Sequence, residues 1–146
     1  MKRITGLIAL VLVAWLAMEN PLPFAPDPEA PTSTVPSNAG PIIPDVAVRD
    51  VDGRVAWRGD VDLGPAIERI ERGERDPHRN DGEVFSNRER RLPDRPRGYY
   101  REFVVRTPGI RHAGPQRLVI GRRGEAWYTA DHYRSFLRLD VEVHPP

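Results

Sequence analysis

The segment YYREFVV, residues 99–105, decides the fold class, because its alternating side chains predict a β-strand. Alternation divides it into two faces, Tyr100, Glu102 and Val104 on one, and Tyr99, Arg101, Phe103 and Val105 on the other. Glutamate is disfavoured inside strands, so Glu102 requires either a partner or a function.

Four more strand-like segments surround this one, with turn residues such as Pro108-Gly109 between them. They are EVF (83–85), QRLVIG (116–121), AWYTA (126–130) and SFLRLDVEV (135–143). Upstream, residues 46–59 predict a hairpin that turns near Asp52-Gly53. The sequence therefore indicates an antiparallel β-sheet.

One helix precedes these strands, within residues 60–74. Asp62 is a candidate N-cap, Pro65 suits the first turn, Ile67 and Ile70 share a face, and Gly73 marks the end. Its Glu and Arg residues are expected to face solvent. A short amphipathic helix packed on an antiparallel β-sheet is an α+β fold.

The first 44 residues predict an export segment and a tether. Residues 1–18 pair a basic start with an apolar run from Ile4, which has the length of a signal peptide and is short for a membrane span. The cleavage site is poor, so an uncleaved signal anchor is the alternative. Residues 19–44 are proline-rich and predict a disordered linker. We expect a folded domain at 45–146, secreted or periplasmic, without stable membrane association unless the signal segment is uncleaved.

Composition narrows the function classes. The chain has no cysteine and four histidines, which excludes disulfides and thiolate zinc sites and disfavours a histidine-based metal site. We expect neither metal nor cofactor. Residues 84–139 hold thirteen arginines against five aspartates and glutamates, and this clustered positive charge predicts an anionic partner. A purely compositional arginine bias is the other interpretation.

Four segments in order resemble the microbial guanyl-specific ribonucleases, the extracellular family that includes barnase. They are DGEVFSNRERRLP (81–93), GYYREFVV (98–105), TPGIRHAGPQRLVIG (107–121) and WYTADHYRSF (127–136). The resemblance covers residues 57–139. It implies an α+β ribonuclease domain that cleaves single-stranded RNA after guanosine without a metal, through a 2′,3′-cyclic phosphate. It also implies a barstar-like cytoplasmic inhibitor as a partner.

The resemblance assigns catalytic roles to matched positions. It places the family's glutamate base at Glu102 and its histidine acid at His132, and histidine suits a proton shuttle because it titrates near neutrality. Arg117 would clamp the phosphate with its guanidinium fork. The simpler alternatives are a cross-strand ion pair between Glu102 and Arg117, and a surface role for Arg117.

A second phosphate-binding arginine is missing from its usual place. The family carries it four residues before Arg117, where this chain has Ala113. Arg111 is the candidate replacement, and the alternative is that Arg111 is a solvated loop residue.

The guanine pocket is expected within FSNRE, residues 85–89. Glu89 would accept both donors of the guanine Watson–Crick edge, and backbone N–H groups of Asn87 and Arg88 would meet O6 and N7. The residues expected to line or flank the base are Phe85, Ser86, Asn87, Arg88, Glu89 and Tyr133. Core packing is the equal alternative for Phe85. His78 is expected to be a surface loop residue, and the alternative is that it lines the site.

Two other functions remain open from the sequence. One is a non-catalytic RNA-binding module of the same fold, and the other is a structural domain tethered to a signal anchor. Retention of Glu102 together with His132 in a basic segment favours the ribonuclease.

Overall fold

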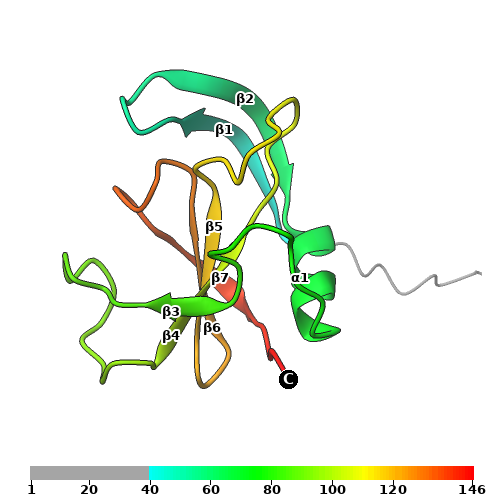
Figure 1. Ribbon diagram of the computed structural model, residues 1–146. Coiled ribbons are helices and arrows are strands. Elements are labelled where there is room, and N and C mark those ends of the chain that lie inside the picture. Colours follow the sequence, from blue (N-terminus) through cyan, green and yellow to red (C-terminus); the bar gives the residue numbers. More distant parts are fainter. Residues whose placement is uncertain (1–39) are drawn as a thin grey trace, which may run out of the picture. The chain divides into compact units, whose positions relative to one another are not determined.

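The computed structural model describes residues 40–146, which form a two-stranded hairpin, one helix and a five-stranded antiparallel sheet (Figure 1). The strands of the sheet run in the order β3-β4-β5-β6-β7, a simple meander. Their bounds are β3 Glu83–Phe85, β4 Tyr100–Val104, β5 Arg117–Gly121, β6 Glu125–Thr129 and β7 Leu137–Glu142. The expected signal segment, 1–18, and most of the expected linker lie outside the described residues. Within 40–146, no helix is long and apolar enough to span a bilayer.

The predicted hairpin is present as β1 (Ile42–Arg49) and β2 (Val55–Asp62). Its turn closes through the N–H of Gly53, which donates to the carbonyl oxygen of Asp50 at 3.0 Å, and Gly53 has the positive φ that the turn requires. β1 begins at Ile42, so residues 42–44, which were expected in the linker, belong to this strand. The strand tolerates Pro44 because the ladder shifts register between Ile43 and Val46.

The helix α1 spans Gly64–Glu71, with Leu63 rather than the expected Asp62 at the N-cap position. Asp62 still supports the helix start, since its Oδ1 accepts a hydrogen bond from the N–H of Gly64 at 2.8 Å. The expectation that every charged helix residue faces solvent is wrong for Arg69. Its guanidinium donates to both carboxylate oxygens of the buried Asp81, at 2.8 and 3.1 Å.

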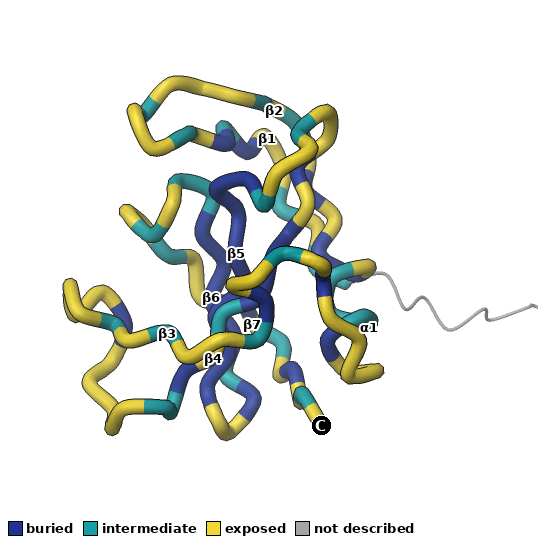
Figure 2. The backbone as a smooth tube through the Cα atoms, in the orientation of Figure 1, coloured by how far each residue is buried: buried dark blue, intermediate teal, exposed yellow. Residues whose placement is uncertain are grey.

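The two faces of the five-stranded sheet carry separate apolar clusters, as the alternation in residues 99–105 predicts. One cluster joins the sheet to the helix and the hairpin and includes Val48, Leu63, Ile70, Phe103, Leu118, Ile120 and Tyr128. The other contains Leu92, Tyr100, Val119 and Trp127. β5 and β6 are buried along almost their whole length (Figure 2). Glu102 shares the face of Tyr100, away from the helix.

Candidate active site

Glu102 lies in the middle of β4, opposite Val119 of β5 and Glu83 of β3. Its Oε2 accepts a hydrogen bond from the hydroxyl of Tyr133. Burial raises the pKa of the Glu102 carboxyl, against the opposing effects of the Tyr133 hydrogen bond and the positive charge of Arg117. The carboxylate forms no ion pair within residues 40–146, so the simple cross-strand pair with Arg117 is absent there.

His132 lies in a tight loop after β6 whose backbone is unusual. His132 and Tyr133 have φ values of 57° and 69°, in the left-handed region that non-glycine residues rarely adopt. The Asp131 carboxylate holds the loop from inside by accepting hydrogen bonds from the N–H groups of Arg134 (3.0 Å) and Ser135 (2.9 Å). The segment DHYRS, residues 131–135, therefore forms a turn that its own Asp131 stabilises, with His132 inside the turn.

The electrostatic environment of His132 disfavours its protonated form. Burial lowers the pKa of the imidazole, and the positive charges of Arg117 and Arg134 lower it further. The pKa values of His132 and Glu102 are thus displaced toward each other. Displaced pKa values of this kind cluster at functional sites.

Tyr133 joins the separate parts of the site. Its hydroxyl bonds to Glu102, and its ring stacks on Phe85 with the centroids 5.4 Å apart at 27°. The same ring lies 5.1 Å from the ring of His132, and the guanidinium carbon of Arg117 lies 6.0 Å from its centroid. Sequence reasoning expected Tyr133 only beside the base, and no sequence pattern indicated its bond to Glu102.

Arg117 is 3% exposed, so it is not a surface arginine. Its Nη1 donates to the carbonyl oxygens of Ala113 (3.1 Å), Gly114 (2.8 Å) and Gln116 (2.7 Å). Its Nε is the buried side-chain nitrogen without a hydrogen-bond partner in the described part of the chain. These bonds fix the guanidinium beside Tyr133, against the loop that carries Ala113.

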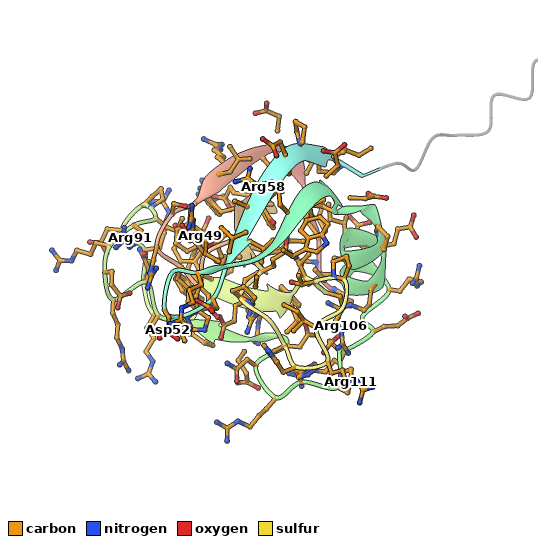
Figure 3. The ribbon with its side chains drawn as sticks, turned by 90° about the horizontal axis from the view of Figure 1, so that it is seen from above. Arg49, Asp52, Arg58, Arg91, Arg106 and Arg111 are labelled. Carbon is orange, nitrogen blue, oxygen red and sulfur yellow. The ribbon has the colours of Figure 1, made fainter. Side chains whose placement is uncertain are left out.

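Arg111 is exposed on the loop between β4 and β5 (Figure 3). The arginine charges that act on His132 are those of Arg117 and Arg134. Arg111 forms no ion pair within residues 40–146.

The loop expected to recognise guanine is held in shape by Asn87. Its Nδ2 donates to the carbonyl oxygen of Leu92 at 2.8 Å, and its Oδ1 accepts from the N–H of Leu92 at 3.0 Å. Asn87 has a positive φ of 49°, which asparagine tolerates better than most residues. Ser86, Arg88 and Glu89 are exposed on this loop. Phe85 is half-buried and packs against the second cluster, as its core alternative predicted.

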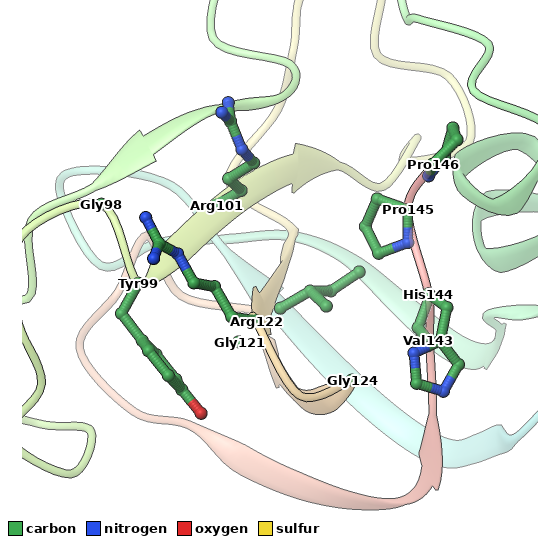
Figure 4. A pocket seen from close by; sticks show the side chains of 11 residues that line it. Gly98, Tyr99, Arg101, Gly121, Arg122, Gly124, Val143, His144, Pro145 and Pro146 are labelled. Atoms are coloured by element: carbon green, nitrogen blue, oxygen red, sulfur yellow. The ribbon is translucent and has the colours of Figure 1, made fainter.

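Glu102 and His132 line none of four hollows found on the described residues. One is lined by Tyr99, Arg101, Arg122, His144 and their neighbours, and contains no predicted site residue (Figure 4). Another adjoins the loop expected to recognise guanine and is lined by residues 85–88, residues 95–97 and Tyr100. Within residues 40–146, no group of three or more carboxylate and histidine side chains is arranged to hold a metal ion. His78 is half-buried, and its Nδ1 lies 2.6 Å from Oδ1 of Asp76.

Comparison with known proteins identifies relatives of this chain. A family model described as ribonuclease matches residues 62–140, just over half of the chain. Guanyl-specific ribonuclease St of Saccharopolyspora erythraea is 51% identical over 74 residues, 51% of this chain and 72% of that protein. Guanyl-specific ribonuclease Sa of Kitasatospora aureofaciens is 46% identical over 65 residues, 44% of this chain and 68% of that protein.

A solved structure agrees with the fold. Ribonuclease Sa2, in a study of its complexes with mononucleotides, superposes with a TM-score of 0.51 at 37% identity, over 66% of this chain and 97% of that one. The helix on an antiparallel sheet and the matching segments lead to one conclusion. The chain belongs to the family of microbial guanyl-specific ribonucleases.

Proposed function

We propose that this protein is a guanyl-preferring endoribonuclease that cleaves single-stranded RNA in two steps, through a 2′,3′-cyclic phosphate. The observation that carries the proposal is the connection of Glu102 to the His132 loop through Tyr133, beside the buried Arg117. Family membership supports it, because the relatives are named guanyl-specific ribonucleases.

In the first step, Glu102 takes the proton from the 2′-hydroxyl of guanosine, and the oxygen attacks phosphorus. The bond from phosphorus to the 5′-oxygen breaks as His132 protonates that oxygen. In the second step, His132 takes a proton from water, which opens the cyclic phosphate, and Glu102 returns its proton to the 2′-oxygen. Each positioned proton-transfer group is typically worth about 10²–10⁴-fold.

The environments of the two groups suit these roles. Burial raises the pKa of Glu102, which makes it a stronger base than an exposed glutamate. Burial and two nearby cations lower the pKa of His132, which makes its protonated form a stronger acid. A phosphate bound beside Arg117 would also supply an acceptor where its Nε now has none. Arg111, exposed on the loop between β4 and β5, would add a second cation.

Guanine recognition is assigned to the loop that Asn87 holds in shape. Glu89 is exposed there and free of ion pairs within the described residues, so its carboxylate is available to the N1–H and N2–H₂ donors of guanine. The backbone N–H groups of Asn87 and Arg88 would meet O6 and N7. Ser86 and Arg88 flank the base, and the ring pair of Phe85 and Tyr133 forms an adjacent apolar wall.

Export belongs to the same proposal. The basic start and apolar run of residues 1–18 support a secreted or periplasmic location, with residues 19–39 as the tether. A free ribonuclease would damage the RNA of its own cell, so a cytoplasmic inhibitor protein is the corresponding partner.

The decisive experiment incubates the purified protein with an oligonucleotide that contains one guanosine, in EDTA, and identifies the products by mass spectrometry. We expect cleavage 3′ of guanosine, with cyclic phosphate ends that later become 3′-phosphates. Glu102→Gln and His132→Ala should each lose most activity, while Glu142→Gln, a change of an exposed carboxylate on β7, should keep it. RNA that is bound but left intact by the unmodified protein would support the binding module instead. Cleavage that requires a divalent ion would contradict the mechanism.

A further inference from the structure

The N-terminal hairpin contacts the loop that carries His132 at two points. The N–H of Arg49 in β1 donates to the carbonyl oxygen of Ala130 at 2.9 Å, before the histidine. The guanidinium of Arg134, after the histidine, donates from Nη2 to the carbonyl oxygen of Val51 in the hairpin turn at 2.6 Å. The ribonuclease family model begins at residue 62, so β1 and the turn precede the matched region.

The hairpin turn lies against the guanidinium of Arg134. Gly53 has a φ of 84°, and a Cβ at this position would lie 2.9 Å from Nη1 of Arg134. Arg49 holds the turn from its other side, with Nη1 donating to the carbonyl oxygen of Gly53 at 2.9 Å. The guanidinium of Arg134 therefore lies close to Gly53, and a Cβ there would displace this flexible end of the side chain. Figure 3 labels Arg49 and Asp52 on this hairpin.

The loop between these two contacts is strained. His132 and Tyr133 both have positive φ values, and non-glycine residues keep such a conformation only when their surroundings impose it. Asp131 holds the loop from inside through the N–H groups that follow the histidine. The two bonds to the hairpin hold it from outside.

We propose that Arg134 is a positioning residue, which bonds the His132 loop to the N-terminal hairpin and holds the imidazole in line with the leaving 5′-oxygen. The inference rests on the proposed function for the role of His132, but the bond itself has a separate readout. Arg134 touches no substrate in this scheme. It acts through the backbone of the residues on either side of His132.

The test compares three variants with the unmodified protein. Arg134→Met removes the charge and the donor at similar length, and Arg134→Lys keeps the charge with a single donor group. Gly53→Ala places a methyl group against Nη1 from the hairpin side. Gly98→Ala is the matched control, since Gly98 has a similar φ of 82° but its Cβ would lie 3.9 Å from the nearest side-chain atom.

The expected result is a fall in kcat for the dinucleotide GpC with little change in KM. Misplacement of a reacting group by about 1 Å can cost up to about 10²-fold, so we expect a loss of roughly tenfold or more in Arg134→Met. Gly53→Ala should fall in the same direction, Arg134→Lys should recover part of the loss, and Gly98→Ala should keep kcat. Amide hydrogen exchange at Tyr133 and Ser135 should quicken in Arg134→Met and Gly53→Ala alone.

Amide exchange reports on the bond whether or not the protein cleaves RNA, so failure of this inference is distinguishable from failure of the ribonuclease assignment. Unchanged exchange and unchanged kcat in Arg134→Met would overturn the positioning role. A pH–rate profile separates the remaining explanation, since the charge of Arg134 also lowers the pKa of His132. If Arg134→Met moves only the basic limb of the pH–rate profile and leaves the pH-independent kcat unchanged, Arg134 acts through its charge and the positioning role is wrong.

Discussion

The hydroxyl of Tyr133 donates a hydrogen bond to the carboxylate of Glu102, so the residue after the proposed acid is bonded to the proposed base. The bond links β4 to the loop after β6. It also opposes the rise that burial causes in the pKa of Glu102. Tyr133 therefore orients the carboxylate and keeps its pKa from rising as far as burial alone would raise it.

Tyr133→Phe should raise the pKa of Glu102 further, because the variant removes a hydrogen bond that favours the charged carboxylate. The acid limb of the kcat/KM profile should move to higher pH, while the ring contact with Phe85 is kept. Tyr128→Phe is the control, since the hydroxyl of this buried tyrosine bonds to Gln116 on the other face of the sheet. An acid limb that stays in place in Tyr133→Phe would contradict this link.

The unmodified enzyme should have a narrow bell-shaped profile of kcat/KM against pH. Activity rises as Glu102 loses its proton, at a pH above the usual glutamate value because its pKa is raised. It falls as His132 loses its proton, at a pH below the usual histidine value because that pKa is lowered. NMR titration of His132 should give the basic limb. A His132 pKa above the ordinary histidine value would contradict the lowering attributed to burial, Arg117 and Arg134.

Much of this arrangement follows from the sequence, and the rest depends on contacts between distant segments. The alternation of residues 99–105 places Glu102 on the face of Tyr100 and Val104. The proposed roles of Glu102 and His132 follow from the resemblance of their segments to the family. The bond from Tyr133 to Glu102 spans 31 residues and has no local signal. The bond from Arg134 to Val51 spans 83 residues, and only the assembled fold brings those two groups together.

Asp76→Asn should destabilise the fold at neutral pH. Burial acts to raise the pKa of Asp76, but hydrogen bonds from His78 and Arg106 outweigh it and lower that pKa. A carboxyl whose pKa is lower in the folded state stabilises the fold at pH values above its pKa in the unfolded chain. This contribution disappears as the pH falls through the pKa of the folded state. We expect a loss of roughly 1.5–3 kcal/mol at neutral pH, the range for a hydrogen bond to a charged group.

Urea unfolding at neutral and acidic pH tests this difference. The difference in the free energy of unfolding between Asp76→Asn and the unmodified protein should become smaller as the pH falls. Asp45→Asn is the control, because its ion pair with Arg58 joins two exposed side chains and should contribute about 0–1 kcal/mol. A gap that is constant with pH would show that the Asp76 charge is not the cause.

Glu89→Gln should reduce the preference for guanosine over adenosine and leave unfolding unchanged. The substitution keeps the size of an exposed side chain but replaces one acceptor oxygen with a donor that opposes the guanine N–H groups. The measurement is the ratio of kcat/KM for GpC and ApC. Glu83→Gln, on neighbouring β3, is the control and should keep the ratio. An unchanged ratio in Glu89→Gln would assign specificity to the loop backbone.

Arg111→Ala tests whether a second arginine binds phosphate beside Arg117. The chain has Ala113 where its family usually carries that arginine, and Arg111 is exposed on the same loop with its side chain available to an anion. A charge-assisted hydrogen bond formed in the transition state is worth roughly 1.5–3 kcal/mol, and its loss should appear mainly in kcat. Arg123→Ala, a change of an exposed arginine between β5 and β6, is the control for general charge. If Arg111→Ala matches Arg123→Ala while Arg117→Ala loses most activity, Arg111 is a solvated loop residue and the enzyme relies on Arg117 alone.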